Sequence, residues 1–116
     1  MPDSGQDLVN QLHEQRKALI DAVNDMKSSG RYLATAERNY KIALRKEILR
    51  LRVEDEVAWT ACESLAKGDE NVAQLRFKRD VHKSDYETAL EKINAIKMEM
   101  RILEGEIKQD WGSGGG

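Results

Sequence analysis

The strongest constraint on this chain is a run of apolar residues in its C-terminal half that recur in alternating steps of three and four. The series consists of Val72, Leu75, Arg79, His82, Tyr86, Ala89, Ile93, Ile96, Met100, Leu103 and Ile107. Nine of these eleven positions are apolar or aromatic. A spacing of 3.5 residues sustained over five heptads keeps one stripe of a helix against a partner helix, as in a left-handed coiled coil. We call this series the seam and expect a helix from about 69 to 110.

The sequence also indicates where that helix starts. Gly68 is expected to end the preceding helix in a left-handed conformation, and Asp69 offers a carboxylate oxygen to the free amides of the next helix. Glu70 adds negative charge at the positive end of that helix. At the other end, residues 112–116 are expected to form a flexible glycine-rich tail beyond Trp111.

The N-terminal half has apolar residues at helical spacing as well. They are Val9, Leu12, Leu19, Val23, Met26, Leu33, Tyr40, Leu44, Ile48 and Leu51. Ser28, Ser29 and Gly30 interrupt the pattern, and a helix from about 5 to 53 can either continue or kink there. We favour the continuous helix, because one glycine in a helix costs only about 1 kcal/mol.

Residues 54–56 are all acidic and predict a polar turn, and residues 57–66 predict a short capping helix. Cys62 and Trp59 are interpreted as packing residues of this helix. The predicted fold is therefore all-α: one domain over residues 1–111, formed by an antiparallel hairpin of two long helices with a short helix at its closed end. Because apolar side chains outside the seam, such as Phe77, Val81 and Met98, would be exposed in a monomer, we expect assembly into a homo-oligomeric helical bundle.

Composition excludes several classes of function. The mean hydropathy is −0.69 and no apolar run approaches the ~18 residues of a spanning helix, so we expect no membrane insertion and a cytoplasmic location. One cysteine and two distant histidines, His13 and His82, predict neither a disulfide nor a metal site. Phosphate-binding loops, nucleophile elbows and metalloprotease motifs are missing from the sequence, so we expect neither an enzyme nor a cofactor.

Charge is segregated along the chain, although the net charge is only −2. The stretch from Arg38 to Arg52 holds six bases and one acid, and the stretch from Arg76 to Lys83 holds four bases and one acid. A fold that turns back near residues 54–69 would bring the two stretches side by side, while acids such as Glu104 and Glu106 gather at the other end. This pattern predicts either a solvated basic face or a site for an anion.

Two seam positions favour the anion site. Arg79 and His82 are polar members of an otherwise apolar series, and a guanidinium facing a core needs a carboxylate or a bound anion. We expect Glu37 or Glu47 of the other helix, or a ligand phosphate, to fill that need. The alternative is an interhelical ion pair that only fixes the register of the helices. As ligand-binding residues we predict Tyr40, Arg45, Arg76, Arg79, His82 and Tyr86.

Several stretches resemble a known group of proteins when taken together. They are residues 36–49 (AERNYKIALRKEIL), the Gly68-Asp69-Glu70 cap, and the run from Leu75 through Tyr86 to Arg101-Ile-Leu-Glu and Trp111. This composite pattern, which spans about residues 30–111, resembles small helical proteins of tailed phages and prophages of Gram-positive bacteria. The acidic turn at 54–56 departs from that pattern, in which a turn with glycine and proline is usual.

The resemblance implies a phage protein in the host cytoplasm, without implying an activity. Our leading hypothesis is a non-catalytic counter-defence protein that sequesters a nucleotide immune signal in a basic pocket between helices or blocks a host defence protein. The alternative is a structural or accessory coiled coil that binds a protein partner or single-stranded DNA in phage replication or assembly. Arginines that point into a closed cavity would favour the nucleotide, and an open basic stripe would favour nucleic acid or an acidic protein.

Overall fold

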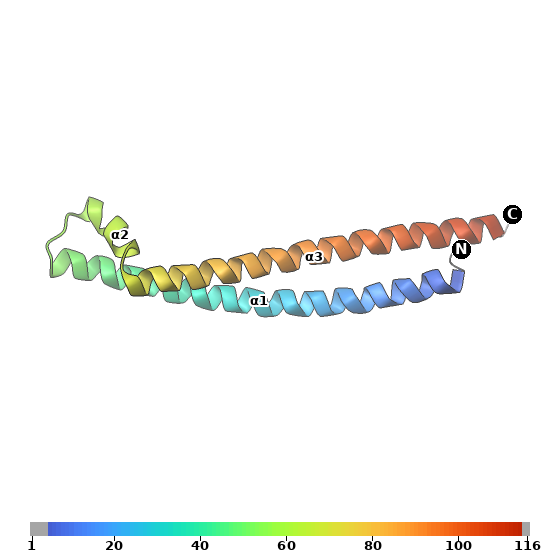
Figure 1. Ribbon diagram of the computed structural model, residues 1–116, viewed down its shortest axis with the longest axis horizontal. Helices are drawn as coiled ribbons and strands as arrows, with labels where there is room; N and C mark the ends of the chain where they lie inside the picture. Colours follow the sequence, from blue (N-terminus) through green and yellow to red (C-terminus); the bar gives the residue numbers. More distant parts are fainter. Residues whose placement is uncertain (1–4, 115–116) are drawn as a thin grey trace. The chain divides into compact units, whose positions relative to one another are not determined.

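The computed structural model describes residues 5–114, and within that range the protein is all-α, as predicted. Three helices follow one another in the chain: α1 (Gly5–Val53), α2 (Trp59–Lys67) and α3 (Glu70–Gly114) (Figure 1). Their contacts divide into two compact units. Unit 1 comprises residues 1–27 and 87–116, and unit 2 comprises residues 28–86.

The predicted seam of α3 matches its buried face. Between Glu70 and Trp111, every seam residue is buried or half-buried, and every residue between them is exposed. The apolar series of the N-terminal half is likewise buried or half-buried on α1. The periodicity of the sequence therefore predicts which face each long helix packs.

In unit 1, the N-terminal part of α1 packs against the C-terminal part of α3. Ala22, Ile93 and Ile96 form the buried cluster, surrounded by half-buried residues that include Leu19 and Met100. Near the chain ends, a side chain on Gly5 would meet the Asp110 carboxylate at 2.9 Å. Higher numbers on α1 thus pair with lower numbers on α3, so the two segments run antiparallel within this unit.

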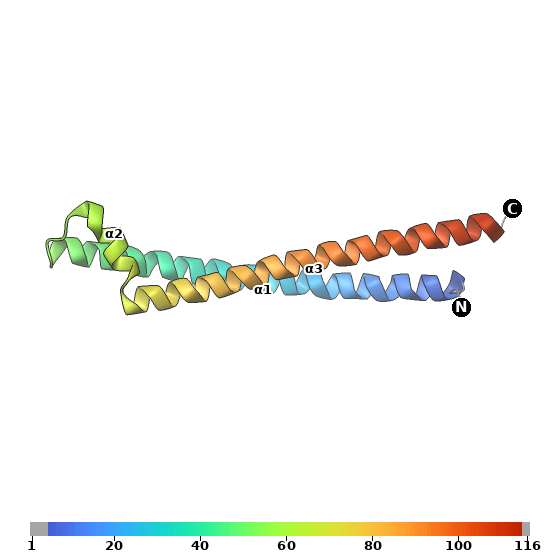
Figure 2. The same cartoon turned by 45° about the horizontal axis from the view of Figure 1, so that its top comes forward.

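In unit 2, α2 covers the end of α1 (Figures 1 and 2). Cys62 and Ala66 of α2 pack with Leu51 of α1, with Leu44 and Ile48 at the margin of the cluster. Cys62 is a buried packing residue, as predicted. The prediction for Trp59 is wrong, because its ring is 59% exposed and its recorded contact is with the guanidinium of Arg52, 5.4 Å from the ring centroid.

The two long helices are also antiparallel within unit 2. Tyr86 of α3 lies against Gly30 of α1, where an added Cβ would meet the tyrosine ring at 3.5 Å. α1 continues as a helix through residues 28–30, so the chain does not break there. The close approach of Tyr86 to Gly30 gives the glycine a packing role that offsets its low helix propensity.

The residue with left-handed backbone lies in the connection between α1 and α2, and not between α2 and α3 as predicted. Gly68 has φ −85° and ψ −9°, so the prediction of a left-handed glycine is wrong. Instead, Glu56 in the acidic turn has φ 56°. The amide of Val57 donates to the carbonyl of Leu51 (3.1 Å) and fixes this reversal of the chain. Asp69 does cap α3, because its Oδ2 accepts from the amide of Val72 at 3.1 Å.

The helix bounds are close to those expected. α2 begins at Trp59 instead of near 57, and α3 extends to Gly114 instead of ending near 110. The first part of the predicted tail, residues 112–114, is therefore helical. Residues 115–116 lie outside the described residues.

The left-handed backbone at Glu56 makes a prediction about stability. An L-residue pays about 1 kcal/mol for this conformation, whereas glycine does not. Glu56→Gly should therefore raise the free energy of unfolding by up to about 1 kcal/mol, as measured by urea denaturation. The matched control is Ala58→Gly, because Ala58 has φ −60° and ψ 140° and needs no glycine. That variant should lower stability; an equal loss in both variants would contradict the prediction.

Candidate functional site

The six residues predicted to bind a ligand all belong to unit 2. α1 carries Tyr40 and Arg45, and the first half of α3 carries the other four. Tyr40 contacts Arg79, another member of the set. His82 and Tyr86 instead contact residues of α1 that were not predicted to bind a ligand.

Tyr40 and Arg79 form the closest pair among the six. The Arg79 guanidinium lies 4.8 Å from the centroid of the Tyr40 ring, a distance typical of a cation–π interaction. Tyr40 is buried, and the side chain of Arg79 is only 24% exposed. The seam therefore does bring a guanidinium and a tyrosine from the two long helices into contact.

The carboxylate partner of Arg79 is its own neighbour. Asp80 Oδ1 accepts a hydrogen bond from Arg79 Nε at 3.0 Å and forms an ion pair with Nη2 at 2.8 Å. The expectation that Glu37 or Glu47 would fill this role is wrong, because Glu37 pairs with Lys41 at 3.6 Å and Glu47 pairs with Arg50. A partner one residue away needs no particular helix register, so Asp80 satisfies Arg79 locally.

His82 and Tyr86 each meet a residue of α1. The His82 ring stacks on Tyr32, with ring centroids 5.6 Å apart and planes at 17°. Tyr86 lies against Gly30. Tyr32 was not predicted from the sequence because it lies outside the apolar series of α1, and it is 62% exposed.

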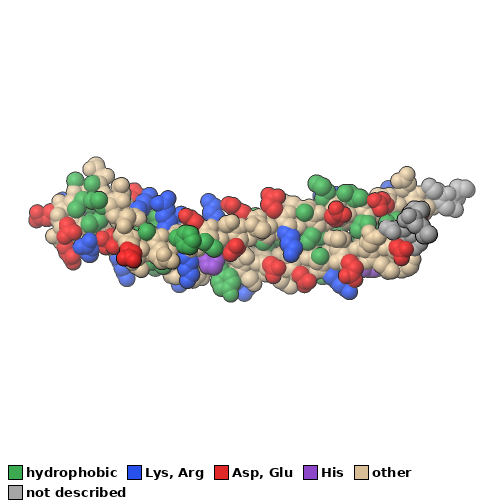
Figure 3. All heavy atoms as spheres, viewed as in Figure 1, with side chains coloured by type: hydrophobic (Ala, Val, Ile, Leu, Met, Phe, Trp, Pro, Cys, Tyr) green, Lys and Arg blue, Asp and Glu red, His purple; other side chains and the backbone are tan. Residues whose placement is uncertain are grey.

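Arg45 and Arg76 are exposed, and within residues 5–114 the structure records no hydrogen bond or ion pair for either of them. Arg45 belongs to a regular series on α1. Arg31, Arg38 and Arg45 follow one another at intervals of seven residues, and all three are exposed and have no recorded partner in the described chain. We call these three residues the arginine row. Figure 3 shows Lys and Arg side chains at the surface of this part of the molecule, on the face in view.

Other arginines of the basic stretch close the turn instead. Arg50 contacts three carboxylates: Glu47 Oε1 at 2.7 Å, Asp55 Oδ2 at 3.3 Å and Glu54 Oε2 at 3.5 Å. Its hydrogen bonds with Glu47 hold the pKa of that carboxyl below the ordinary value and raise the pKa of the guanidinium. Arg52 continues the seven-residue interval of the arginine row, but Nη1 donates to the carbonyl of Val57 at 3.4 Å.

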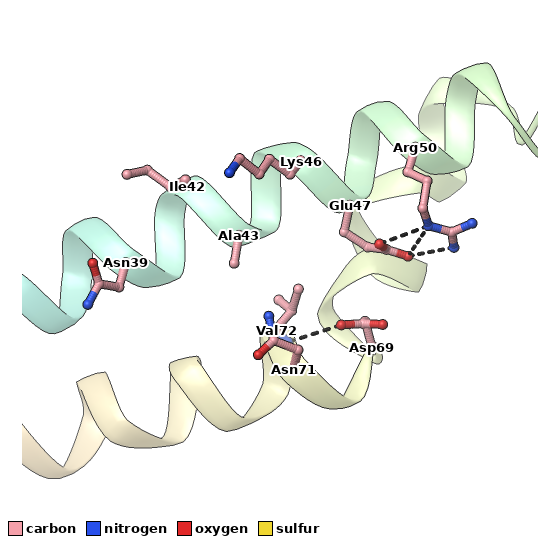
Figure 4. Close-up of a pocket in the computed structure, with 9 residues that line it drawn as sticks. All are labelled: Asn39, Ile42, Ala43, Lys46, Glu47, Arg50, Asp69, Asn71 and Val72. Atoms are coloured by element: carbon pink, nitrogen blue, oxygen red, sulfur yellow. Dashed lines mark hydrogen bonds and ion pairs between the residues drawn. The ribbon is translucent and has the colours of Figure 1, made fainter.

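A cavity of about 360 Å³ lies between α1 and the start of α3 (Figure 4). Its lining consists of Asn39, Ile42, Ala43, Lys46, Glu47, Arg50, Asp69, Asn71 and Val72. The carboxylates of Glu47 and Asp69 are already engaged, by Arg50 and by the cap of α3. None of the six predicted residues lines this cavity, which is open to solvent and mixes apolar, amide and charged groups.

No family model, no curated protein and no solved structure matches the chain in comparisons of sequence and fold. Among the described residues, no group of histidine, cysteine and acidic side chains is placed to hold a metal ion. No helix in the described range is long and apolar enough to cross a bilayer.

The Arg50–Glu47 contact makes a prediction about titration. In Arg50→Gln, the pKa of Glu47 should rise towards its ordinary value of 4.5, because the charge-assisted hydrogen bonds are lost. A carboxyl whose folded pKa is lowered stabilises the fold above its unfolded pKa and loses that contribution as the pH falls through the folded pKa. Carboxyl ¹³C titration by NMR measures the pKa, and urea denaturation at several pH values measures the change in stability.

The matched control is Lys41→Gln, because Lys41 pairs with Glu37 instead of Glu47. This variant should leave the titration of Glu47 where it is. If Glu47 titrates at the same pH in the wild type and in Arg50→Gln, the Arg50 contact does not lower the pKa of Glu47, and the prediction is contradicted.

Proposed function

We propose that this chain is a non-catalytic accessory protein that binds an extended polyanion, single-stranded DNA, along the arginine row of unit 2. The observation that carries the proposal is the row itself: Arg31, Arg38 and Arg45 are exposed, regularly spaced and unpaired within the described residues. All three side chains are exposed to solvent, and an exposed row of cations favours a polyanion over a small ligand.

The spacing of the row supports an extended ligand. Seven residues advance a helix by about 10.5 Å, so the outer two arginines lie about 21 Å apart along α1. The donors that hold one phosphate group converge on it, whereas these three guanidinium groups are too far apart to share a mononucleotide. A single strand is flexible enough to place successive phosphates against each of them.

The chemistry of the row also fits the phosphate backbone. Arginine binds phosphate through paired N–H donors, and contacts of this kind carry affinity without selecting a sequence. Tyr32 belongs to the same unit, and although one face of its ring stacks on His82, the side chain is 62% exposed and offers a surface for stacking with a base. The ligand expected is therefore a single strand of any sequence.

A second candidate function is the sequestration of a nucleotide immune signal, a counter-defence role. The contact between Arg79 and Tyr40 supports this role, because it places a guanidinium beside an aromatic ring. Asp80 engages only Nε and Nη2 of that guanidinium. Nη1 has no recorded hydrogen bond among residues 5–114 and remains able to donate to a phosphate. In this alternative His82 and Tyr86 would contact the base or the ribose.

The setting of both functions is part of the proposal. The resemblance to small phage proteins supports action in the host cytoplasm, in replication, assembly or counter-defence. We also propose that the antiparallel pairing within each unit belongs to one hairpin, and that the hairpins assemble into a homo-oligomeric bundle. The apolar side chains that are exposed in a single chain, among them Phe77 and Met98, support self-association.

The proposal predicts a salt-dependent affinity for an oligodeoxythymidine of about 20 nucleotides, measured by fluorescence anisotropy. Each phosphate contact contributes about −0.7 to the slope of log K against log salt, so three contacts give a slope of about −2. Arg38→Gln should weaken binding about five- to thirtyfold, corresponding to about 1–2 kcal/mol, and reduce the slope by about 0.7.

The matched control is Arg16→Gln, which removes one exposed positive charge from α1 outside unit 2. It should change neither the affinity nor the slope. Equal weakening by the two substitutions would mean a general charge effect and would contradict the arginine row. Calorimetric titration with cyclic and ADP-ribose-type nucleotides tests the second candidate: binding lost in Arg79→Gln, without binding of the oligonucleotide, would replace the first proposal.

A further inference from the structure

The structure exposes a second stripe on α3 that the seam does not use. It consists of the residues two positions after each seam residue, from Gln74 to Gln109, and all eleven of them are exposed. We call this series the outer stripe. Its apolar members are Phe77, Val81, Ala95, Met98 and Ile102.

The outer stripe is almost free of charge. Glu91 is its one charged residue, although 34% of the whole chain is charged. The solvent-facing positions of a two-helix coiled coil are ordinarily polar and charged, because nothing covers them. Phe77 and Met98 are each 63% exposed. Monomeric proteins rarely expose large apolar side chains repeatedly along one helix face. The stripe repeats in steps of three and four, so a helix is the partner whose geometry it fits.

We propose that the outer stripe binds the outer stripe of a second copy of this chain, with the two α3 helices antiparallel and centred between Ala89 and Leu90. This proposal specifies the interface of the self-association proposed above and does not depend on the ligand. In this register the largest apolar residues of the two stripes face each other. Phe77 faces Ile102 of the second copy, and Val81 faces its Met98.

The residues that flank the stripe select this register by charge. It brings Lys78 opposite Glu99 of the second copy, Asp85 opposite Lys92, and Asp80 opposite Arg101. Each pair occurs twice because the arrangement is two-fold symmetric. The remaining flanking pairs combine a charged residue with a neutral one, so the register contains no like-charge pair.

Other registers are worse. A parallel, in-register pairing brings Asp80 opposite Asp85 of the second copy. Shifting the antiparallel pairing by one heptad brings Lys92 against Lys92 in one direction and Lys78 against Lys92 in the other. Like charges directly across such an interface disfavour pairing, so complementarity selects the register centred between residues 89 and 90.

The flanking charges are also available for these contacts. Within the described residues the structure records no ion pair for Lys78, Asp85, Lys92, Glu99 or Arg101. Asp80 is the exception, since it pairs with Arg79. The distribution of charge along the chain agrees: residues 28–86 carry 12 bases and 10 acids, a net charge of +2, and the rest carries 7 bases and 11 acids, a net charge of −4. Antiparallel pairing brings these opposite net charges together.

Sedimentation equilibrium of the full chain tests the interface. The wild type should dimerise. Met98→Ala should raise the dimer dissociation constant at least tenfold, while Ile20→Ala, which removes an equally exposed apolar side chain from α1, should leave it unchanged. Both residues are exposed in the single chain, so neither substitution should reduce the helical content measured by circular dichroism. Glu91→Gln should tighten the dimer, because the two Glu91 carboxylates lie in adjacent layers of the proposed interface.

Charge reversal tests the register. Lys78→Glu should weaken the dimer about tenfold, because the introduced carboxylate would then face Glu99 at both symmetry-related contacts, and adding Glu99→Lys should restore it. A wild type that remains monomeric at 100-fold higher concentration than the binding assay requires would overturn the proposal. So would a dimer that is insensitive to Met98→Ala and to Lys78→Glu.

Disulfide trapping tests the direction of the helices. Ser84 faces Ala95 of the second copy in the proposed register. Mixing Ser84→Cys protein with Ala95→Cys protein under mild oxidation should therefore give the mixed disulfide dimer. Neither variant alone should cross-link efficiently, because identical positions lie several turns apart in the antiparallel pair. The native Cys62 is buried and is present in all samples, so any cross-linking through it gives the same background in each. Cross-linking of each variant with itself would indicate parallel helices and overturn the proposal.

Discussion

Packing of apolar side chains along the seam of α3 is the interaction on which the rest of the structure depends. Its members from Val72 to Ile107 are the residues that α3 turns away from solvent, and the residues between them are exposed. Neither long helix is apolar on all sides. Each is therefore held in place by the contact between its apolar face and the segment of the other long helix in the same unit. The placement of Arg79, His82 and Tyr86 follows from the seam, because all three are members of it.

The sequence predicts this framework well because periodicity, caps and acidic turns are local signals. The seam, the turn at residues 54–56 and the Asp69 cap are all found in the structure. The left-handed residue was predicted at Gly68 and is Glu56, because the path of the chain between α1 and α2 decides where the reversal falls. Small buried residues such as Ala22 and Ala36 were missed, since alanine carries little hydrophobic signal and is buried only when its helix neighbour comes close.

The basic residues were harder to predict, because a sequence does not say which cations find a carboxylate. Arg50 meets three acids and Arg52 meets a backbone carbonyl, since the turn folds back over them. Arg79 takes Asp80, the adjacent residue, in place of a glutamate on the other helix. Arg31, Arg38 and Arg45 are exposed, and the structure records no partner for them within the described residues. The division between paired and unpaired cations thus comes from contacts with neighbours along the chain, at the turn and on α3, and not from composition.

The most direct test of the seam is a distance measured across it within unit 1. Spin labels on cysteines at Arg16 and Lys97, both exposed positions, can be measured by double electron–electron resonance after dilution with unlabelled protein. Packed helix axes lie about 8–10 Å apart, so antiparallel pairing along the seam predicts a label separation below about 25 Å. A separation well above that value, in a sample that retains its helical content, would contradict the pairing of α1 with α3 and with it the account of the fold.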